Sequence, residues 1–455
     1  MRQIHADFSQ PGGKVRPLHA VNNGPVYKFT EDQRITNLDA FREAKIPFAR
    51  THDAAFCSSY GGEHIVDVHM IFPDFARDPD DPAAYDFCLT DEYLRVMRFA
   101  GVTPFFRLGS KIEHWAKKYG TLPPKDNEKW ARVCEHIIRH YTEGWADGFR
   151  WEMPYWEIWN EPDGAPDDAD PVDKKCWGGT AEEFYEFFAV AAKHLKHCFP
   201  HLKIGGPATV CAATDWTEHF FAYLREQDVP LDFYSWHRYT ADPRAIAEDA
   251  RAARALLCRY GYREAESILN EWNYVKSFSG QDWIDSIRAE KGLRGAAFTA
   301  AVMCAASAVP VDMLMYYDAR PCAMNGLFET DLVCNRLKGY YPFRMFGRLY
   351  TLGTEAACRA EGDDLFACAA MRAEGDGRGA AVLLTRYADE ATDEADVALR
   401  LTSLPFGGPV RLRFYLLDEG HDEAAVREEY LSSPDGVVYL RLKNLDTYLV
   451  TVEPM

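Results

Sequence analysis

The stretch Trp156–Asp163, which reads WEIWNEPD, is the part of the chain from which the architecture can be worked out. Tyr155–Asn160 has the aromatic and aliphatic residues of a buried strand. Because side chains alternate along a strand, Glu157 and Glu161 share one face, and Glu161 comes where the chain leaves the sheet. An isolated Asn-Glu pair is typical of a surface loop. The whole Trp-Asn-Glu-Pro string after a strand instead indicates a carboxylate that faces a ligand.

Short β-type runs alternate with amphipathic stretches on both sides of this motif, from about residue 15 to residue 350. Such alternation predicts parallel βα units, and eight of them predict a (β/α)8 TIM barrel of α/β class. The motif then ends the fourth strand, at the barrel edge where active sites are built. The eight candidate strands are Pro17–Val21, Pro47–Thr51, Val102–Leu108, Tyr155–Asn160, Lys203–Gly206, Leu231–Trp236, Ser267–Asn270 and Met313–Tyr317.

Helical periodicity is clearest in Ala181–Cys198, where Thr180 and Glu183 have the spacing of a capping box. The long connection after the second strand contains a β-like run, His64–Phe72. We interpret this run as an excursion over the barrel mouth, with a barrel strand as the alternative. The other stretches that we expect to be helical are Glu31–Lys45, Asp126–Tyr141, Ala245–Tyr260 and Trp283–Ala308.

Residues 351–455 have a different sequence pattern, with short β-rich runs separated by Gly, Asp and Pro turns. No helical stretch of comparable quality lies between them, so we expect an accessory antiparallel β-sandwich domain. Residues 1–14 are expected to join it. The candidate strands of this domain are Leu365–Met371, Ala380–Tyr387, Val397–Leu401, Val410–Leu417 and Val437–Val452.

Composition limits the classes of partner. The chain has 455 residues and a formal net charge of −19, which argues against nucleic acids and anionic membranes as partners and favours a neutral substrate. Its start has no apolar run of signal-peptide length, and no segment approaches the roughly 20 apolar residues of a membrane span. The 12 cysteines are scattered, so we expect reduced thiols, no zinc site and a cytoplasmic protein. A homo-oligomer stays open.

A second acidic motif, Ile268–Asn273, ends the seventh candidate strand and contains Glu271. Strands four and seven of an eight-stranded barrel can direct Glu161 and Glu271 at each other across the mouth. Cleavage of a glycosidic bond needs such a pair, one acid to protonate the departing oxygen and one carboxylate to attack or to activate water. The distance between the two decides between retention and inversion of the anomeric configuration.

These motifs resemble the large clan of retaining (β/α)8 glycosidases, which has Asn-Glu-Pro at strand four and a glutamate at strand seven. Within the clan the chain is most similar to glycoside hydrolase family 39, the β-xylosidase and α-L-iduronidase family. The supporting strings are Leu18–Pro25, Ala49–Asp53 and Ser235–Tyr239. The resemblance implies a retaining hydrolase that acts on an oligosaccharide or glycoside, with a β-xyloside or related pentoside as the substrate. The long βα connections suggest a pocket closed on one side, and hence exo-action that releases a terminal sugar. We expect no cofactor and no metal.

The resemblance also implies roles for single residues. Glu161 would be the general acid/base and Glu271 the nucleophile. Asn160 would bind the hydroxyl next to the anomeric carbon, and Arg50 and Tyr239 would keep Glu271 ionised, since hydrogen bonds and positive charge favour a carboxylate. The other residues expected in the sugar pocket are His52, His237, Trp272, Asn273 and Tyr317.

Two departures from the family's sequence pattern leave the identity of the sugar open. Asn270 stands where relatives usually have a threonine, and Tyr316–Arg320 replaces a stretch in which many relatives place a tryptophan. A hexoside is therefore one alternative. A uronide is another, and its carboxylate would need a cation such as Arg238, Lys276 or Arg320. An alternative of a different class is a non-catalytic carbohydrate-binding protein on a degenerate glycosidase fold, which predicts the loss of one carboxylate.

Two further groups of residues have competing interpretations. His64, Asp67 and His69 could ligate a metal, but on a strand His64 would face away from the other two, so we favour ordinary polar residues. Among tryptophans outside the motif, Trp115, Trp145, Trp151 and Trp177, packing is the first interpretation, and Trp177 is the first candidate for a sugar platform.

Overall fold

The computed structural model describes residues 1–29, 34–54, 62–330, 334–390 and 393–455. Eight parallel strands form a closed barrel in the order β10-β11-β2-β5-β6-β7-β8-β9. Each of the eight strands expected from the sequence is present, and the (β/α)8 class is confirmed. The strands are β2 (Ala20–Asn22), β5 (Phe48–Arg50), β6 (Thr103–Leu108), β7 (Tyr155–Ile158), β8 (Lys203–Thr209), β9 (Phe233–Thr240), β10 (Glu266–Tyr274) and β11 (Met313–Tyr316).

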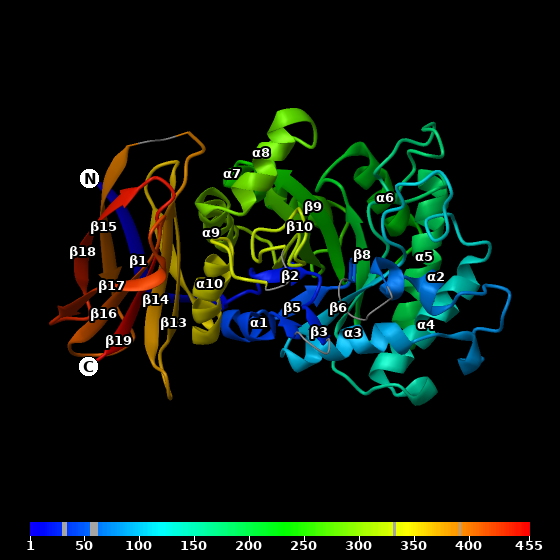
Figure 1. Cartoon of the computed structure of the whole chain (residues 1–455), viewed down its shortest axis with the longest axis horizontal. Coiled ribbons are helices and arrows are strands. Elements are labelled where there is room, and N and C mark those ends of the chain that lie inside the picture. Colours follow the sequence, from blue (N-terminus) through cyan, green and yellow to red (C-terminus); the bar gives the residue numbers. More distant parts are fainter. Residues whose placement is uncertain (30–33, 55–61, 331–333, 391–392) are drawn as a thin grey trace.

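Alternation along these strands divides their side chains between the barrel interior and the helix layer. One interior cluster includes Phe105, Tyr155, Phe233, Ile268 and Met313, all buried. Such layers fill the base of a barrel and leave the carboxyl ends of the strands for a site. The helices around the strands (Figure 1) are α1 (Leu38–Ala44), α3 (Cys88–Phe99), α4 (Asn127–Thr142), α5 (Ala181–Cys198), α6 (Asp215–Glu226), α7 (Pro243–Arg259), α8 (Gly280–Glu290), α9 (Leu293–Ser307) and α10 (Tyr340–Leu352).

Helix α5 has the predicted limits and the predicted capping box. The backbone N–H of Glu183 donates to Oγ1 of Thr180, and the backbone N–H of Thr180 donates to the Glu183 carboxylate. Two orphan donors of the first turn are satisfied in this way.

The expectation of a β-like run at His64–Phe72 was wrong. The segment forms a 3-10 helix, Glu63–Val66, and the short helix α2, Val68–Ile71. Its apolar residues Ile65, Val68 and Ile71 are buried at a spacing of three, which a helical turn places on one face and a strand does not.

Two predicted helices have other limits. Helix α1 begins at Leu38, because Arg34–Thr36 (β4) pairs with Tyr27–Phe29 (β3) in a hairpin; residues 31–33 lie outside the described residues. The single helix expected over Trp283–Ala308 is divided into α8 and α9. Gly292 separates them in an extended conformation, and Gly295 lies so close to Glu290 that a Cβ would come within 2.6 Å of the Glu290 Cα.

The second sheet has nine strands in the order β17-β16-β19-β14-β13-β12-β1-β15-β18. It is mostly antiparallel, but β1 pairs with β15 in parallel, so the N-terminal residues join it as expected. Its two halves share one core, in which Ile4 and Leu399 cluster with Val382 and Val450. The strands are β1 (Arg2–Lys14), β12 (Thr354–Ala360), β13 (Leu365–Arg372), β14 (Gly379–Arg386), β15 (Glu394–Thr402), β16 (Val410–Leu417), β17 (Asp422–Leu431), β18 (Gly436–Lys443) and β19 (Thr447–Pro454).

Sequence patterns missed strands β12 and β17 and fused β18 with β19 into one run. Strands β13 and β14 pack on helices α9 and α10, so this sheet covers one side of the barrel, and both chain termini lie on it (Figure 1).

Within the described part of the chain, every helix is too short or too polar to cross a membrane. Eleven cysteines there are free thiols, and Cys57 lies outside the described residues. The cytoplasmic location stays a prediction.

Candidate active site

Glu161 follows strand β7 on a turn that holds its side chain above the barrel. Trp159 and Glu161 have φ angles of 79° and 48°, in the left-handed region that disfavours residues with a Cβ. The backbone N–H of Glu161 donates to the carbonyl of Ala208 at 2.9 Å, so the turn is tied to strand β8. Non-glycine residues in this region cost about 1–3 kcal/mol each, and such strain clusters at functional sites.

The Glu161 carboxylate has two polar neighbours within the described residues. Its Oε1 lies 2.9 Å from Nδ1 of His237, and its Oε2 accepts from the Cys176 thiol at 3.6 Å. The side chain is 17% exposed, so it can exchange a proton with a ligand or with water.

Glu271, on strand β10, is only 3% exposed and has cationic and polar neighbours. Nη1 of Arg50 donates to its Oε1 at 2.7 Å, and the Tyr239 hydroxyl donates to its Oε2 at 2.8 Å. Nε2 of His52 lies 3.3 Å and Nε2 of His237 lies 3.5 Å from Oε1.

This surrounding fixes the charge of Glu271. Burial alone would raise the pKa of Glu271, but His237, His52 and Arg50, with the Tyr239 hydroxyl, lower it to about 2. Glu271 is therefore an ionised carboxylate across the neutral range.

The two glutamates converge as the sequence predicts. Strands β7 and β10 are three positions apart around the barrel. A carboxylate oxygen of Glu161, a carboxylate oxygen of Glu271 and a ring nitrogen of His237 all lie within 4.8 Å of one another. A small ligand group placed at the mouth can therefore contact both carboxylates.

Arg50, fully buried at the end of β5, connects several polar groups beneath the pair. Besides contacting Glu271, it donates through Nη2 to Oδ1 of Asn160 at 2.6 Å and through Nε to Oε2 of Glu157 at 2.6 Å. Burial opposes its charge, but Glu157 and Glu271 outweigh this effect and raise the pKa of Arg50. With Oδ1 of Asn160 occupied in this way, the amide Nδ2 is buried and has no partner among the described residues, so it is available to a ligand.

Glu157 is a site residue to which the sequence reasoning gave no role. Fully buried, it accepts from Ser235 and Asn270 at 2.6 Å each, as well as from Arg50. The available signal was its shared strand face with Glu161. Its position on β7 shows that it orients Arg50 from below and lies too deep for a ligand.

Trp272 does not lie with the other predicted pocket residues. Its ring is fully buried and packs against Tyr316, at 5.3 Å between ring centroids, and against Phe298 of α9, at 6.3 Å. Because neighbouring side chains on a strand point in opposite directions, Glu271 faces the mouth and Trp272 faces the helix layer. The expectation of a substrate contact for Trp272 is corrected accordingly.

Asn273 and Tyr317 belong to the wall of the mouth. The Asn273 amide donates to the Tyr317 carbonyl at 2.8 Å, and Asn273 is 1% exposed, so it supports the wall from behind. The Tyr317 ring packs edge-on against His52 at 5.3 Å, and its hydroxyl donates to Asp53 at 3.2 Å.

Asp53 is a second residue that the sequence reasoning did not assign. Its Oδ2 lies 3.0 Å from Nδ1 of His52. Burial opposes the ionisation of Asp53, but His52, Arg320 and Lys111 hold its pKa well below the usual range. Asp53 thereby orients His52 with its other nitrogen towards Glu271.

His64, Asp67 and His69 do come within 4.8 Å of one another, because the segment is helical and not a strand. However, Oδ1 of Asp67 accepts from Nη2 of Arg107 at 2.5 Å and from the backbone N–H of Lys111 at 2.9 Å. Its Oδ2 lies 2.7 Å from His64. The carboxylate is already neutralised by a buried guanidinium, which makes this cluster a poor cation site.

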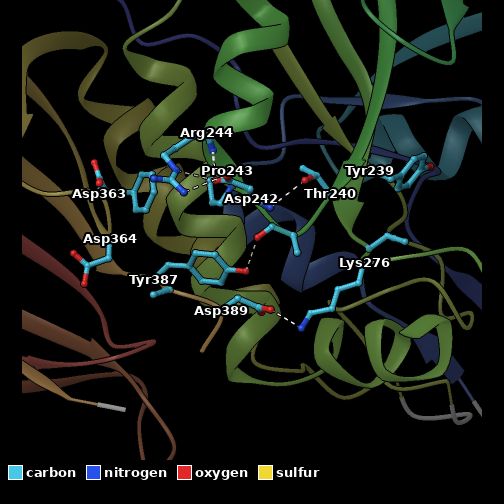
Figure 2. A pocket seen from close by; sticks show the side chains of 14 residues that line it. Tyr239, Thr240, Asp242, Pro243, Arg244, Lys276, Asp363, Asp364, Tyr387 and Asp389 are labelled. Atoms are coloured by element: carbon cyan, nitrogen blue, oxygen red, sulfur yellow. Dashed lines mark hydrogen bonds and ion pairs between the residues drawn. The ribbon is translucent and has the colours of Figure 1, made fainter. Parts of the chain in front are cut away.

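A cavity of about 620 Å³ lies beside the mouth, between the barrel and the second sheet (Figure 2). Tyr239 lines one end, and Lys276 reaches across to Asp389, with Nζ and Oδ2 2.5 Å apart. Asp389 also accepts from Tyr274 at 2.8 Å and from Arg294 at 2.7 Å. The second sheet is thus bound to strand β10, which carries Glu271.

Known proteins resemble the chain both in sequence and in fold. The model of glycosyl hydrolases family 39 matches residues 52–276. A β-xylosidase of Caldicellulosiruptor saccharolyticus is 28% identical over 219 residues, which cover 43% of this chain and 42% of that protein. A β-xylosidase of Geobacillus stearothermophilus is 27% identical over 170 residues, covering 34% of this chain and 31% of that protein. The chain thus spans less than half the length of these relatives.

Two solved structures extend the likeness over the whole chain. A glucosidase from Croceicoccus marinus superposes with a TM-score of 0.80 at 25% identity, covering 100% of this chain and 99% of that one. A monomeric β-xylosidase from Caulobacter crescentus superposes with a TM-score of 0.69 at 18% identity, covering 100% of both chains, and shares the fold.

Proposed function

We propose that this chain hydrolyses O-glycosidic bonds with retention of configuration, because residues 52–276 match the model of glycosyl hydrolases family 39. Glu271 is the nucleophile and Glu161 is the general acid/base. The observation that carries this proposal is the approach of the two carboxylates to within 4.8 Å in unlike surroundings. A degenerate, non-catalytic carbohydrate-binding protein would have lost one of them, and this chain has both.

The reaction proceeds by two displacements. Glu271 attacks the anomeric carbon while the Glu161 proton passes to the departing oxygen, so the glycosidic C–O bond breaks and a glycosyl ester forms on Glu271. Water then attacks the same carbon, Glu161 takes its proton, and the ester bond breaks to release the sugar. Glu271 suits the role of nucleophile because its pKa is lowered to about 2. Glu161 suits the role of general acid/base because it faces the open side of the mouth.

Retention is favoured by distance. Carboxyl groups about 5–5.5 Å apart leave no room for a water between nucleophile and sugar, whereas inverting enzymes hold them about 6.5–9.5 Å apart. In this chain an oxygen of Glu161 lies within 4.8 Å of an oxygen of Glu271, which supports the shorter separation of a retaining enzyme.

A neutral sugar suits the pocket better than a uronide. Nδ2 of Asn160 is buried and has no hydrogen-bond partner among the described residues, and Nε2 of His52 and Nε2 of His237 make no hydrogen bond there, although they lie 3.3 and 3.5 Å from Oε1 of Glu271. They surround the carboxylate pair and suit the hydroxyls of one sugar ring. We propose a terminal β-xyloside or related pentoside as the substrate, in line with the β-xylosidases of similar sequence.

The cations that a uronide would need are all engaged. Arg238 lies 3.1 Å from Asp249, Lys276 pairs with Asp389, and Arg320 pairs with Asp53, Glu63 and Asp318. A hexoside is the second candidate, because the Croceicoccus marinus protein, which matches over the whole chain, is a glucosidase. We also propose exo-action, because the connections between β6 and α4 and between β7 and α5 are long enough to close the mouth on one side.

We also propose residues 15–350 as the catalytic domain and residues 351–455, joined by 1–14, as the accessory domain.

Two substitutions test the mechanism. Glu271→Ala should lose turnover and regain it with azide, giving a glycosyl azide of inverted configuration. Glu161→Ala should act only on substrates with good leaving groups.

Proton NMR of the first product formed by the wild type should show retention. Nitrophenyl β-xyloside, α-arabinoside, β-glucoside and β-glucuronide identify the sugar. Normal turnover in either variant would contradict the assignment.

A further inference from the structure

We propose that Trp115 is a stacking platform for a sugar ring of the leaving group, on the Glu161 side of the mouth. This inference rests on the proposed function, because only a glycosidase has a leaving group. Trp115 lies in the connection between β6 and α4, one of the long connections at the carboxyl ends of the barrel strands.

Exposure distinguishes Trp115 from the other tryptophans considered as platforms. Its side chain is 80% exposed, whereas Trp177 is 4% exposed and packs against Trp159 and Phe184. Trp145 and Trp151 are half-buried against the barrel core. Among these four tryptophans, Trp115 is therefore the one whose ring is free to stack on a ligand.

The segment that carries Trp115 is held firmly. Glu113, two residues earlier, is 5% exposed, and its carboxylate accepts from the backbone N–H groups of Tyr119, Gly120 and Thr121 at 2.9–3.2 Å. The Thr121 hydroxyl donates to the same carboxylate at 2.6 Å. A buried carboxylate with four donors fixes the loop before any ligand arrives, and a preorganised loop loses little entropy on binding.

This loop is bonded to the segment beside Glu161. The backbone N–H of Glu113 donates to the Lys175 carbonyl at 2.9 Å, and the N–H of Gly178 donates to the Thr121 carbonyl at 2.9 Å. Between these two bonds lies Cys176, whose thiol donates to Glu161 at 3.6 Å. The Trp115 loop is therefore continuous with the wall on the side of the general acid.

That position decides which part of the substrate Trp115 meets. Glu161 protonates the glycosidic oxygen, so the group that departs lies on its side, opposite the nucleophile. An indole offers a flat apolar face, which suits the CH face of a pyranose. The occupant is thus a ring of the leaving oligosaccharide and not the sugar that forms the glycosyl ester.

The test compares two donors with the same transferred sugar. Xylotriose has rings in its leaving group, and β-xylosyl fluoride has none. For Trp115→Ala we expect kcat/KM on xylotriose to fall roughly tenfold, as for the loss of about 60 Å² of apolar contact. We expect kcat/KM on the fluoride to stay within about twofold. Trp115→Phe, which keeps a flat ring, should recover most of the loss.

Phe99→Ala is the matched control, because Phe99 is 66% exposed at the end of α3, next to the amino ends of the strands. It should change neither donor. Equal loss on both donors in Trp115→Ala, or no loss on either, overturns the platform. If wild type cleaves neither xylose donor, the pentoside proposal has failed, and cellotriose with β-glucosyl fluoride decides the platform by the same ratio.

Discussion

Nη1 of Arg50 lies 2.7 Å from Oε1 of Glu271, and the exposed fractions of the two side chains are 0% and 5%. The same guanidinium donates to Glu157 and to Asn160. One cation thus orients the proposed nucleophile, the amide beside the proposed general acid and a buried acid on strand β7. A planar group with five donors can do this, and an ammonium cannot.

Arg50→Lys should therefore disable the site. A lysine keeps the charge but cannot reach Glu157, Asn160 and Glu271 together, and each lost hydrogen bond to a charged group is worth about 1.5–3 kcal/mol. We expect kcat/KM to fall at least about a hundredfold and the free energy of unfolding, from urea denaturation, to decrease. Arg244→Lys, in an exposed pair with Asp242, is the control and should change neither. Wild-type kcat/KM in Arg50→Lys would refute the role of the guanidinium.

Tyr239→Phe should move the acid limb of the pH profile. The phenol donates to the ionised Glu271 carboxylate, which lowers the pKa of Glu271, so its removal raises that pKa. The acid limb of kcat/KM then shifts to higher pH. At pH 7 Glu271 is still ionised, so the loss of roughly ten- to hundredfold in kcat reflects orientation and transition-state stabilisation.

Tyr262→Phe is the matched control for this profile, because that hydroxyl donates to the Val229 carbonyl and not to a residue of the site. Its acid limb should stay in place. Coincident acid limbs for wild type and Tyr239→Phe would show that the hydrogen bond does not set the charge of Glu271.

The barrel was predictable because each strand is a short apolar run followed by a helix, a local pattern that needs no knowledge of contacts. The pairing of Glu161 with Glu271 followed from the order of the strands. Trp272 was assigned to the pocket because it is adjacent to Glu271 in sequence, but the strand pleat sends adjacent side chains to opposite layers. The alternation of side chains along a strand, applied to β10, would have placed Glu271 at the mouth and Trp272 in the helix layer.

Other parts of the site depend on contacts between distant segments. Asp53 is held ionised by His52 together with Arg320 and Lys111, and these two cations approach from other connections. The helical turns at Glu63–Ile71 were predicted as a β-like run, because the periodicity of so short a segment does not distinguish a helix from a strand. Buried Asp67 bonded to Arg107 stabilises them, and this long-range pair leaves no local signature.

Asp389→Asn should weaken the attachment of the second sheet to the barrel. Burial opposes the ionisation of Asp389, but hydrogen bonds from Lys276 and Tyr274 and the charge of Arg294 lower its pKa below the usual 3.8. A carboxylate with a lowered pKa in the folded state adds stability above its unfolded pKa and loses it as pH falls further.

Urea denaturation of Asp389→Asn at pH 7 should therefore give a free energy of unfolding lower by about 1–2 kcal/mol, and the difference should shrink below about pH 4. Asp363→Asn, in the same cavity wall, serves as control. A difference independent of pH would mean that the charge of Asp389 is not what holds the sheet.

Glu290→Gln should stabilise the protein, and more so at alkaline pH. Glu290 is 1% exposed, and neither carboxyl oxygen has a hydrogen-bond partner among the described residues. Burial raises its pKa from 4.5 to about 9. Between these values the unfolded state loses its proton while the folded state keeps it, so stability falls as pH rises through this window. Glutamine has the same shape and no such proton.

The unfolding free energy of Glu290→Gln should thus match wild type near pH 4 and exceed it by about 2–4 kcal/mol at pH 8. Exposed Glu264→Gln should show no pH-dependent difference. A Glu290→Gln variant less stable than wild type at pH 8 would mean that an ionised Glu290 holds the end of α8 in place.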